Sequence, residues 1–154
     1  MTSLSRRSII KSGLASLAAT ALITPPAEAA ILPAIEAYRN PGCGCCEKWA
    51  EQMKQAGFSV NMQDDPSLDD RRAKAGVPAG LAGCHTAFMG DYIIEGHVPP
   101  QDILSFLNVK SAARGLAVPG MPSGSPGMEA GGVADNFSTM IFYADGTSSV
   151  FANH

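Results

Sequence analysis

Four cysteines are the residues of this chain best suited to chemistry. Three of them lie in the run Cys43-Gly44-Cys45-Cys46, and the fourth is Cys84. A Cys-x-x-Cys spacing at the start of a helix suits a redox dithiol, because a helix N-terminus lowers the pKa of a thiol. It also suits a metal, because thiolates are ligands and residues three apart share a helix face. Cys45 has no role in a dithiol, so three crowded sulfurs favour a metal, or several metals with bridging thiolates.

The directions of Cys45 and Cys84 depend on the local backbone. On a regular helix Cys45 would point away from its two neighbouring cysteines, unless Gly44 lets the backbone bend so that all three sulfurs face one side. Cys84 opens a predicted strand beside His85, and neighbours in a strand point to opposite faces. We therefore expect Cys84 to be the better ligand, with His85 as a further candidate. The alternative for Cys45 and Cys84 is that of buried apolar residues.

Two methionines in a loop rich in proline and glycine bear on the choice of metal. Met121 and Met128 lie where packing does not obviously require them. Thiolate and thioether ligands are soft and select Cu(I), whereas Zn²⁺ prefers closed sets of cysteine and histidine. We therefore predict copper, favouring Cu(I) and allowing more than one ion. His97 is a further candidate ligand. Its alternative is a core or capping role, and the alternative for each methionine is a loop anchor.

Hydrophobic periodicity predicts the elements that position these residues. We expect strands at 35–39, 58–62, 84–89 and 92–95, and helices from the cysteine run to Gly57, at 67–75 (with Asp65 as N-cap), and from 99 onward. Trp49, Met53 and Phe58 are expected in the core. The order β-α-β-α-β-β-α predicts an α/β, thioredoxin-like domain. A Pro/Gly/Met loop at 118–128 and an added C-terminal β-hairpin at 139–151 follow it, and we expect the terminal His154 to be mobile.

The first 29 residues resemble an export signal. Arg6-Arg7 and Lys11 precede a short apolar run, and Ala27-Glu28-Ala29 offers a small-x-small cleavage site. We predict a twin-arginine-type signal peptide at 1–29 and a metal-binding domain at 30–154 in the periplasm, where disulfides are permitted. The alternative for the first segment is an uncleaved amphipathic anchor.

Composition limits the class of protein. The chain has 154 residues, 45% of them hydrophobic and 16% charged, which fits one globular domain and excludes a disordered chain. The net charge of −3 argues against nucleic acid as a partner. Beyond the signal we expect no membrane span.

Four separated motifs resemble one known family. They are Cys43-Gly44-Cys45-Cys46 with Trp49, Gly83-Cys84-His85-Thr86, Glu95-Gly96-His97-Val98-Pro99, and the run from Gly115 to Met128. Together they resemble the domain-of-unknown-function family 411, which includes CopG-like copper-resistance proteins. The resemblance implies a periplasmic metal-binding protein with a thioredoxin-like fold, which holds copper on the cysteines and interconverts Cu(I) and Cu(II). Gly83 is a departure, because serine is expected there.

The leading hypothesis is a periplasmic copper-binding protein for copper tolerance. Its first ligands are Cys43, Cys45, Cys46 and Cys84, with His85, His97, Met121 and Met128 as nearby candidates. Its partners are copper ions and other periplasmic copper-handling proteins, and a copper oxidoreductase activity stays open. One alternative is a thiol–disulfide oxidoreductase that uses the Cys-x-x-Cys pair. A weaker alternative is a disulfide-stapled binding module without free thiols or metal.

Overall fold

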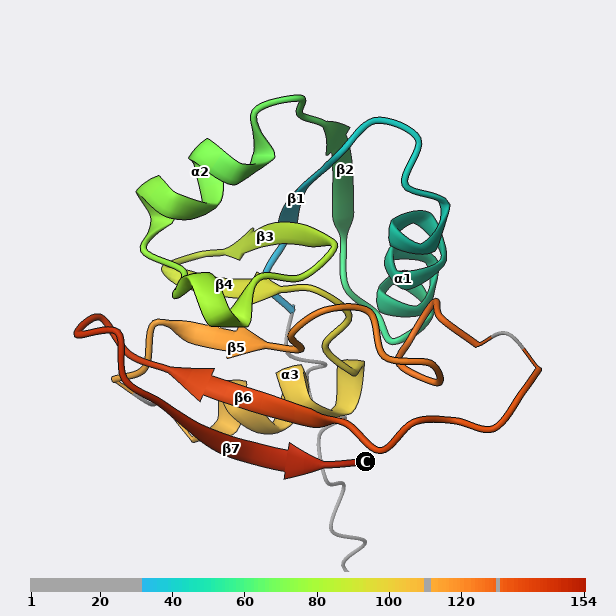
Figure 1. The fold of residues 1–154 in the computed structure, drawn as a ribbon. Coiled ribbons are helices and arrows are strands. Elements are labelled where there is room, and N and C mark those ends of the chain that lie inside the picture. The colour runs from blue at the N-terminus through green and yellow to red at the C-terminus, as the bar shows by residue number, and fades with distance from the viewer. Residues whose placement is uncertain (1–31, 110–111, 130) are drawn as a thin grey trace, which may run out of the picture. The chain divides into compact units, whose positions relative to one another are not determined.

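The computed structural model describes residues 32–109, 112–129 and 131–154, and within them seven strands form one sheet (Figure 1). The predicted export signal lies outside the described residues. The strands are β1 (Ile35–Arg39), β2 (Val60–Asp64), β3 (His85–Met89), β4 (Tyr92–Glu95), β5 (Gly115–Ala117), β6 (Ser138–Phe142) and β7 (Ser148–Asn153). The helices are α1 (Gly44–Gln55), α2 (Leu68–Ala75) and α3 (Pro100–Asn108), with a short 3-10 turn at Ala79–Leu81.

The sheet is mixed, which confirms the expected α/β class. Its order is β2-β1-β3-β4-β5-β6-β7. The pairs β1–β2 and β4–β5 are parallel, and the other neighbours are antiparallel. The predicted β-α-β-α-β-β-α order is therefore present through α3. The C-terminal hairpin extends the sheet through β5, a strand of three residues that the sequence pattern did not reveal.

Each face of the sheet has its own core. Ile93 and Ile94 are neighbours on β4, so their side chains point to opposite faces. Ile94 belongs to the larger cluster, with Trp49 of α1 and Phe106 of α3. Ile93 belongs to a smaller cluster with Val77, which follows α2. Helices α1 and α3 therefore cover one face, and the segment after α2 covers the other.

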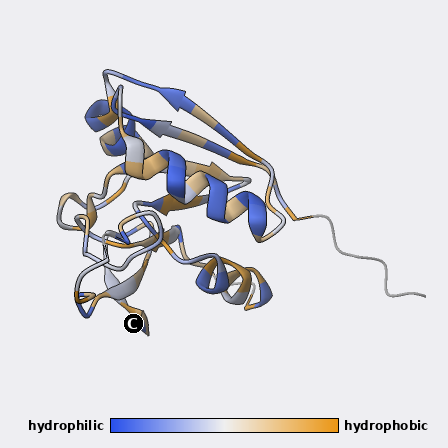
Figure 2. Ribbon diagram, turned by 90° about the vertical axis from the view of Figure 1, so that its right-hand side faces the viewer, coloured by the Kyte–Doolittle hydropathy of each residue, from blue (hydrophilic) through white to orange (hydrophobic). Residues whose placement is uncertain are grey.

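Helix α1 is amphipathic, and its buried apolar side includes Cys46. Cys46, Trp49, Ala50 and Met53 are buried, at the i, i+3, i+4, i+7 spacing of one helix face. Figure 2 shows hydrophilic and hydrophobic residues alternating along this helix as its two faces turn past the viewer. The prediction that Trp49, Met53 and Phe58 are core residues is confirmed. Burial of such side chains contributes about 1.5–3 kcal/mol each.

Helix α2 begins slightly later than expected. Leu68 is its first residue, and Ser67 precedes it. The expected N-cap, Asp65, instead accepts hydrogen bonds at Oδ1 from the Ser67 N–H (2.9 Å) and hydroxyl (2.7 Å). These bonds lower the pKa of Asp65 to about 2, with Arg71 contributing. The carboxylate thus organises the turn before the helix and not the helix end itself.

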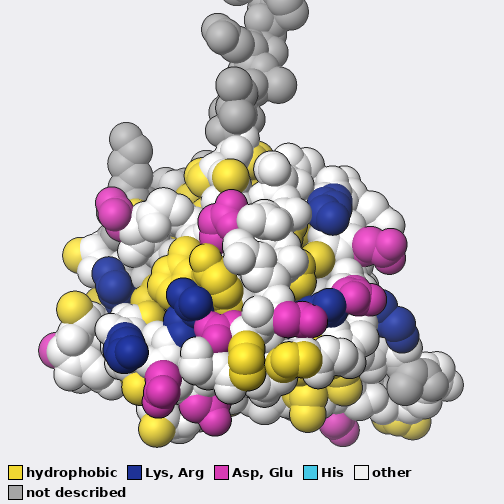
Figure 3. Space-filling view, turned by 90° about the horizontal axis from the view of Figure 1, so that it is seen from above, with side chains coloured by type: hydrophobic (Ala, Val, Ile, Leu, Met, Phe, Trp, Pro, Cys, Tyr) yellow, Lys and Arg dark blue, Asp and Glu magenta, His cyan; other side chains and the backbone are white. Residues whose placement is uncertain are grey.

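Charges of both signs are interspersed over the face of the described residues drawn in Figure 3. Among those residues, every helix is too short or too polar to serve as a membrane span.

The C-terminal residue is anchored, which corrects the expectation of a mobile end. His154 Nε2 lies 2.9 Å from Oδ2 of the buried Asp102, and the same oxygen accepts a hydrogen bond from the Thr139 hydroxyl. The ring of His154 stacks on Phe137 at a centroid distance of 4.7 Å, and the two residues exchange backbone hydrogen bonds. The sequence pattern did not reveal this anchoring, because the partners come from α3, from β6 and from Phe137 just before β6.

We predict that His154→Ala lowers the free energy of unfolding by about 1–2 kcal/mol, because it removes a stacked ring and a partner of a buried carboxylate. Urea unfolding checks this. The control is Asn153→Ala, whose exposed side chain accepts only the Ser138 hydroxyl and should cost less than about 0.5 kcal/mol. Equal losses in the two variants would contradict the anchoring role.

Candidate metal centre

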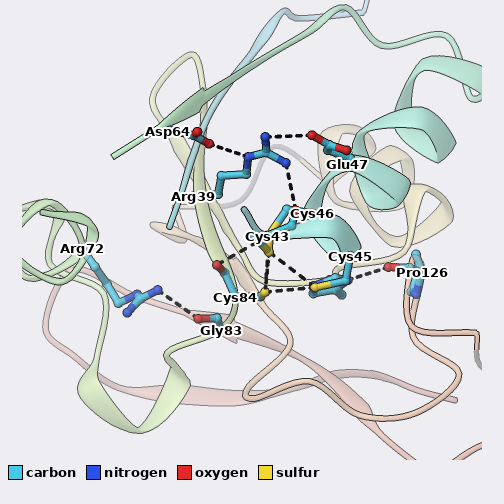
Figure 4. Close-up of a disulfide and its surroundings, with 11 residues drawn as sticks. Arg39, Cys43, Cys45, Cys46, Glu47, Asp64, Arg72, Gly83, Cys84 and Pro126 are labelled. Atoms are coloured by element: carbon cyan, nitrogen blue, oxygen red, sulfur yellow. Dashed lines mark hydrogen bonds and ion pairs between the residues drawn. A yellow bond between two sulfur atoms is a disulfide. The ribbon is translucent and has the colours of Figure 1, made fainter. Parts of the chain in front are cut away.

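Four sulfur atoms meet at the N-terminal end of α1 (Figure 4). Cys43, Cys45 and Cys46 come from the start of the helix, and Cys84 directly precedes β3. The Sγ of Cys84 lies 3.0 Å from that of Cys43, and 3.3 Å from those of Cys45 and Cys46. All four Sγ atoms lie within 4.8 Å of one another. The structure therefore brings together the four cysteines that the sequence analysis selected from two distant segments.

Cys45 joins the group without the backbone bend expected at Gly44. The helix starts at Gly44, and the left-handed conformation in this segment belongs to Gly42, with φ of 80°. Side chains of a helix tilt toward its N-terminus, and at the first turn no earlier turn lies below them. Cys45 and Cys46, although they differ in direction around the axis, can therefore both lean over the helix end, where Cys84 lies.

Two of the four sulfurs are joined, and two are free. Cys43 and Cys46 form a disulfide, whereas Cys45 and Cys84 are thiols. Burial is the main cause that raises the pKa of Cys84 to about 12, and its hydrogen bond with Cys45 adds to it. Cys84 is thus protonated at neutral pH in the metal-free protein, and a bound cation must displace this proton. The two free thiols disagree with the weaker alternative of a disulfide-stapled binding module, which predicts no free thiols.

A second, buried group of donors adjoins the four sulfurs and shares Cys46 with them. Cys46, His85 and His97 place one donor atom each within 4.8 Å of the others. His97 Nδ1 lies 2.6 Å from the Pro126 carbonyl oxygen, which can only accept, so Nδ1 carries the hydrogen and Nε2 keeps its lone pair. Neither that Nε2 nor either ring nitrogen of His85 has a hydrogen-bond partner among the described residues.

The chemistry of these histidines fits metal ligation. Buried nitrogens usually have a partner, so three orphaned ones require an explanation. A histidine that donates Nδ1–H to a carbonyl and leaves Nε2 free has the arrangement common in metal sites. Burial holds the pKa of His85 well below its usual range and lowers that of His97, so both rings are in the neutral form that binds metals. Cys84 and His85 fall into different groups, as expected, although the strand begins at His85 and not at Cys84 as predicted.

The loop after β5 packs on the first turns of α1. A Cβ at Gly127, where φ is 89°, would lie 2.6 Å from the Cys45 carbonyl oxygen, so the approach requires glycine. Glu129 fastens the loop, because its carboxylate accepts hydrogen bonds from the Gly127 N–H (2.9 Å) and the Gln52 amide (2.8 Å). The loop also supplies the Pro126 carbonyl, and thereby orients His97.

The two loop methionines have different places. Met121 is 56% exposed and lines a cavity of about 410 Å³ together with Cys43 and Cys84. Met128 is half-buried and is not among the residues that line this cavity. Its backbone closes the loop on Ser125. Met121 is thus at the accessible side of the sulfur group.

Sequence reasoning missed three charged residues around the cysteines. Arg39 donates a hydrogen bond to the Cys43 carbonyl oxygen at 2.8 Å, which holds the residue before α1. Arg72 and Glu95 form a buried ion pair at 2.7 Å, and both also bind the backbone of Gly83. Glu95 could have been noticed in the sequence as an acidic residue at the end of the apolar strand β4. Its partner on α2 could not, because that pairing depends on the tertiary structure.

Comparison with known proteins agrees with the fold and the site. A family model described as "Protein of unknown function, DUF411" matches residues 81–128. Two solved structures, "Copper resistance protein copG" in Form 1 and in Form 2, are each 36% identical to this chain, covering 80% of it and 98% of their own chains. Their TM-scores are 0.75 and 0.76. No match was found among the curated proteins.

Fold and site thus define a mixed α/β protein with a cysteine-rich candidate metal centre. The chain belongs to the DUF411 family of CopG-like proteins. The cysteine group and these relatives fit a copper-related role.

We predict that the stability of the metal-free protein falls below about pH 6.5, because His85 and His97 are buried neutral and the unfolded chain takes up protons that the folded chain does not. Above that pH both states hold them neutral, and no penalty arises. Urea unfolding between about pH 7.5 and pH 5 measures the slope, which each histidine steepens by up to about 1.4 kcal/mol per pH unit. His85→Phe should unfold with a shallower slope, and an unchanged slope would contradict the prediction.

Proposed function

We propose that this protein binds Cu(I) on Cys43, Cys45, Cys46 and Cys84 and thereby serves copper tolerance in the periplasm. The observation that carries the proposal is the meeting of four sulfurs whose closest approaches to Cys84 are 3.0–3.3 Å. Four thiolates in such proximity repel one another, and cations neutralise them. Soft sulfur donors select Cu(I) among the common metal ions. The relatives named for copper resistance support the same ion.

The neighbouring donors extend the proposed site on two sides. His85 and His97 would take a further ion on the buried side, because they share Cys46 with the sulfur group. A thiolate can bridge two ions, so more than one copper per chain is part of the proposal. Met121 would bind from the accessible side as a thioether. Met128 stays a candidate ligand on the sequence argument alone.

The fold supports the finer assignment to the thioredoxin-like class. Strands β2-β1-β3-β4 have the order and directions of that class, and α1 and α3 share one face. The cysteine run opens the first helix, as it does in redox proteins of this type. Export of residues 30–154 after cleavage at Ala29 would place the site among other copper-handling proteins of the periplasm. Cell fractionation and N-terminal sequencing test the location and the cleavage.

The Cys43–Cys46 disulfide favours a second candidate function, thiol–disulfide exchange. This function predicts insulin reduction by the metal-free dithiol form, and it needs neither Cys45 nor Met121. Copper oxidoreduction is the corresponding possibility for the loaded site, since copper can alternate between Cu(I) and Cu(II) when a partner exchanges one electron. Insulin-reduction assays and electron paramagnetic resonance of the oxidised copper form distinguish the two.

We predict that the reduced protein binds Cu(I) in competition with a Cu(I)-specific chelator, and that Cys43→Ser with Cys46→Ser weakens binding by at least about a hundredfold, which corresponds to about 2.7 kcal/mol. Two of four sulfurs are then lost, including the one shared with the histidines. Anaerobic titration and copper analysis measure affinity and stoichiometry. The control is His154→Ala. This residue is distant from the cysteines in the sequence, and none of its contact partners described above is a cysteine. Unchanged affinity in the double variant would reject the proposal.

We predict a smaller loss for Met121→Leu, because the thioether is an additional ligand at the rim of the cavity. Cu(I) affinity should fall by about tenfold, equal to about 1.4 kcal/mol, while the copper content at saturation stays the same. The matched control is Met62→Leu on β2, which does not line the cavity. If both substitutions leave the affinity equal to that of the wild type, Met121 is not a ligand.

A further inference from the structure

The peptide before Cys84 is held by a buried ion pair. The Gly83 N–H donates to Glu95 Oε1 at 2.7 Å, and Arg72 Nη2 donates to the Gly83 carbonyl oxygen at 2.9 Å. Arg72 Nε closes the arrangement with a bond of 2.7 Å to the same Glu95 oxygen. Both backbone groups of Gly83 are therefore bound by side chains from α2 and β4 (Figure 4 shows the bond from Arg72).

The ion pair is buried and its hydrogen-bonding groups are occupied. The side chain of Glu95 is 0% exposed and that of Arg72 is 10% exposed. The other Glu95 oxygen accepts the Thr86 hydroxyl at 2.6 Å, and Arg72 Nη1 lies 2.7 Å from Asp69 at the surface. A buried ion pair adds little net stability, because desolvation offsets its attraction. The main effect of this ion pair is therefore to fix the position of the Gly83 backbone, to which both of its members are hydrogen-bonded.

Steric contact fixes the same residue from the other side. A Cβ at Gly83 would lie 2.6 Å from the Cα of Gly96, and 3.2 Å from the Val118 carbonyl oxygen. Gly83 is the position where the sequence departs from the expected serine, and here the close approach of the two backbones requires glycine. The segment is thus pinned between Gly96 and the ion pair, and the next side chain along it is Cys84.

We propose that Arg72 and Glu95 are positioning residues that hold Cys84 in reach of the other three sulfurs. Arg72 also lines the cavity beside Cys43 and Cys84, and it is the one cationic side chain among the residues that line this cavity. The inference rests on the proposed copper site for its functional meaning, but the placement of Cys84 is a property of the metal-free protein as well.

The test is a double-mutant cycle with Cys84. Arg72→Met combined with Glu95→Leu removes both charges and leaves no buried charge unpaired. Glu95→Gln, of nearly the same shape, is the second variant should the first not fold. Each is made with Cys84 present and with Cys84→Ser, and Cu(I) affinity is measured by chelator competition. We expect a loss of about tenfold or more with Cys84 present and little further loss with Cys84→Ser.

Two controls separate positioning from loss of stability. Phe106→Leu destabilises the core where it contacts Tyr92 and Phe151, and it should leave Cu(I) affinity unchanged. Arg71 lies on the same helix as Arg72, and Arg71→Met removes its ion pair with Asp65. This variant should also bind Cu(I) as the wild type does. An equal loss in the two Cys84 backgrounds, or no loss in either, would overturn the proposal.

A readout without metal keeps this inference distinct from the proposed function. With Cys43→Ser and Cys46→Ser, only the Cys45 and Cys84 thiols remain, 3.3 Å apart in the parent structure. Diamide joins them: two S–H bonds break, one S–S bond forms, and the diazene takes up both protons and both electrons. Mass spectrometry follows the reaction. Loss of Arg72 and Glu95 should slow it about tenfold or more by displacing Cys84, and an unchanged rate would refute the positioning role even if the protein bound no copper.

Discussion

The site depends on the close approach of three backbone segments at one end of α1. The first turn of the helix, the Gly83–Cys84 segment and the loop around Gly127 meet there, and side chains at either glycine would collide with neighbouring backbone. Only this approach brings a sulfur from residue 84 to within 3.0 Å of one from residue 43. The local run Cys43–Cys46 supplies three of the sulfurs, and backbone packing with the core beneath it brings Cys84 to them.

The fold accepts an energetic cost at this place. Three buried ring nitrogens of His85 and His97 have no hydrogen-bond partner among the described residues, and each such group costs about 1–3 kcal/mol. A raised pKa keeps the Cys84 thiol protonated in the same region. The apolar clusters on the two faces of the sheet offset this cost. A bound cation would accept the lone pair of His97 Nε2 and that of one His85 ring nitrogen, which is why these unsatisfied atoms support a metal site more strongly than the cysteine spacing alone.

Local patterns predicted what local interactions determine. The strand at Ile35–Arg39, the hairpin after Cys84 and the buried side of α1 follow from periodicity and turn residues, and the structure confirms them. The grouping of Cys45 with the other sulfurs agrees with the predicted ligand set, but its cause is the tilt of side chains at a first turn and not a bend at Gly44. The Arg72–Glu95 pair and the anchoring of His154 join elements far apart in the chain, so they depend on tertiary structure that a sequence pattern does not contain.

The two candidate functions use the same sulfurs and exclude one another at any moment. The thiolate is the ligand form of cysteine, so a disulfide between Cys43 and Cys46 withdraws two of the four sulfurs from a metal. Cys46 is the only donor shared by the outer sulfur group and the buried group with His85 and His97. Oxidation of this one pair therefore separates the groups, leaving two thiols on one side and two imidazoles on the other. Under the proposed function, reduction of the disulfide is the step that must precede full loading with copper.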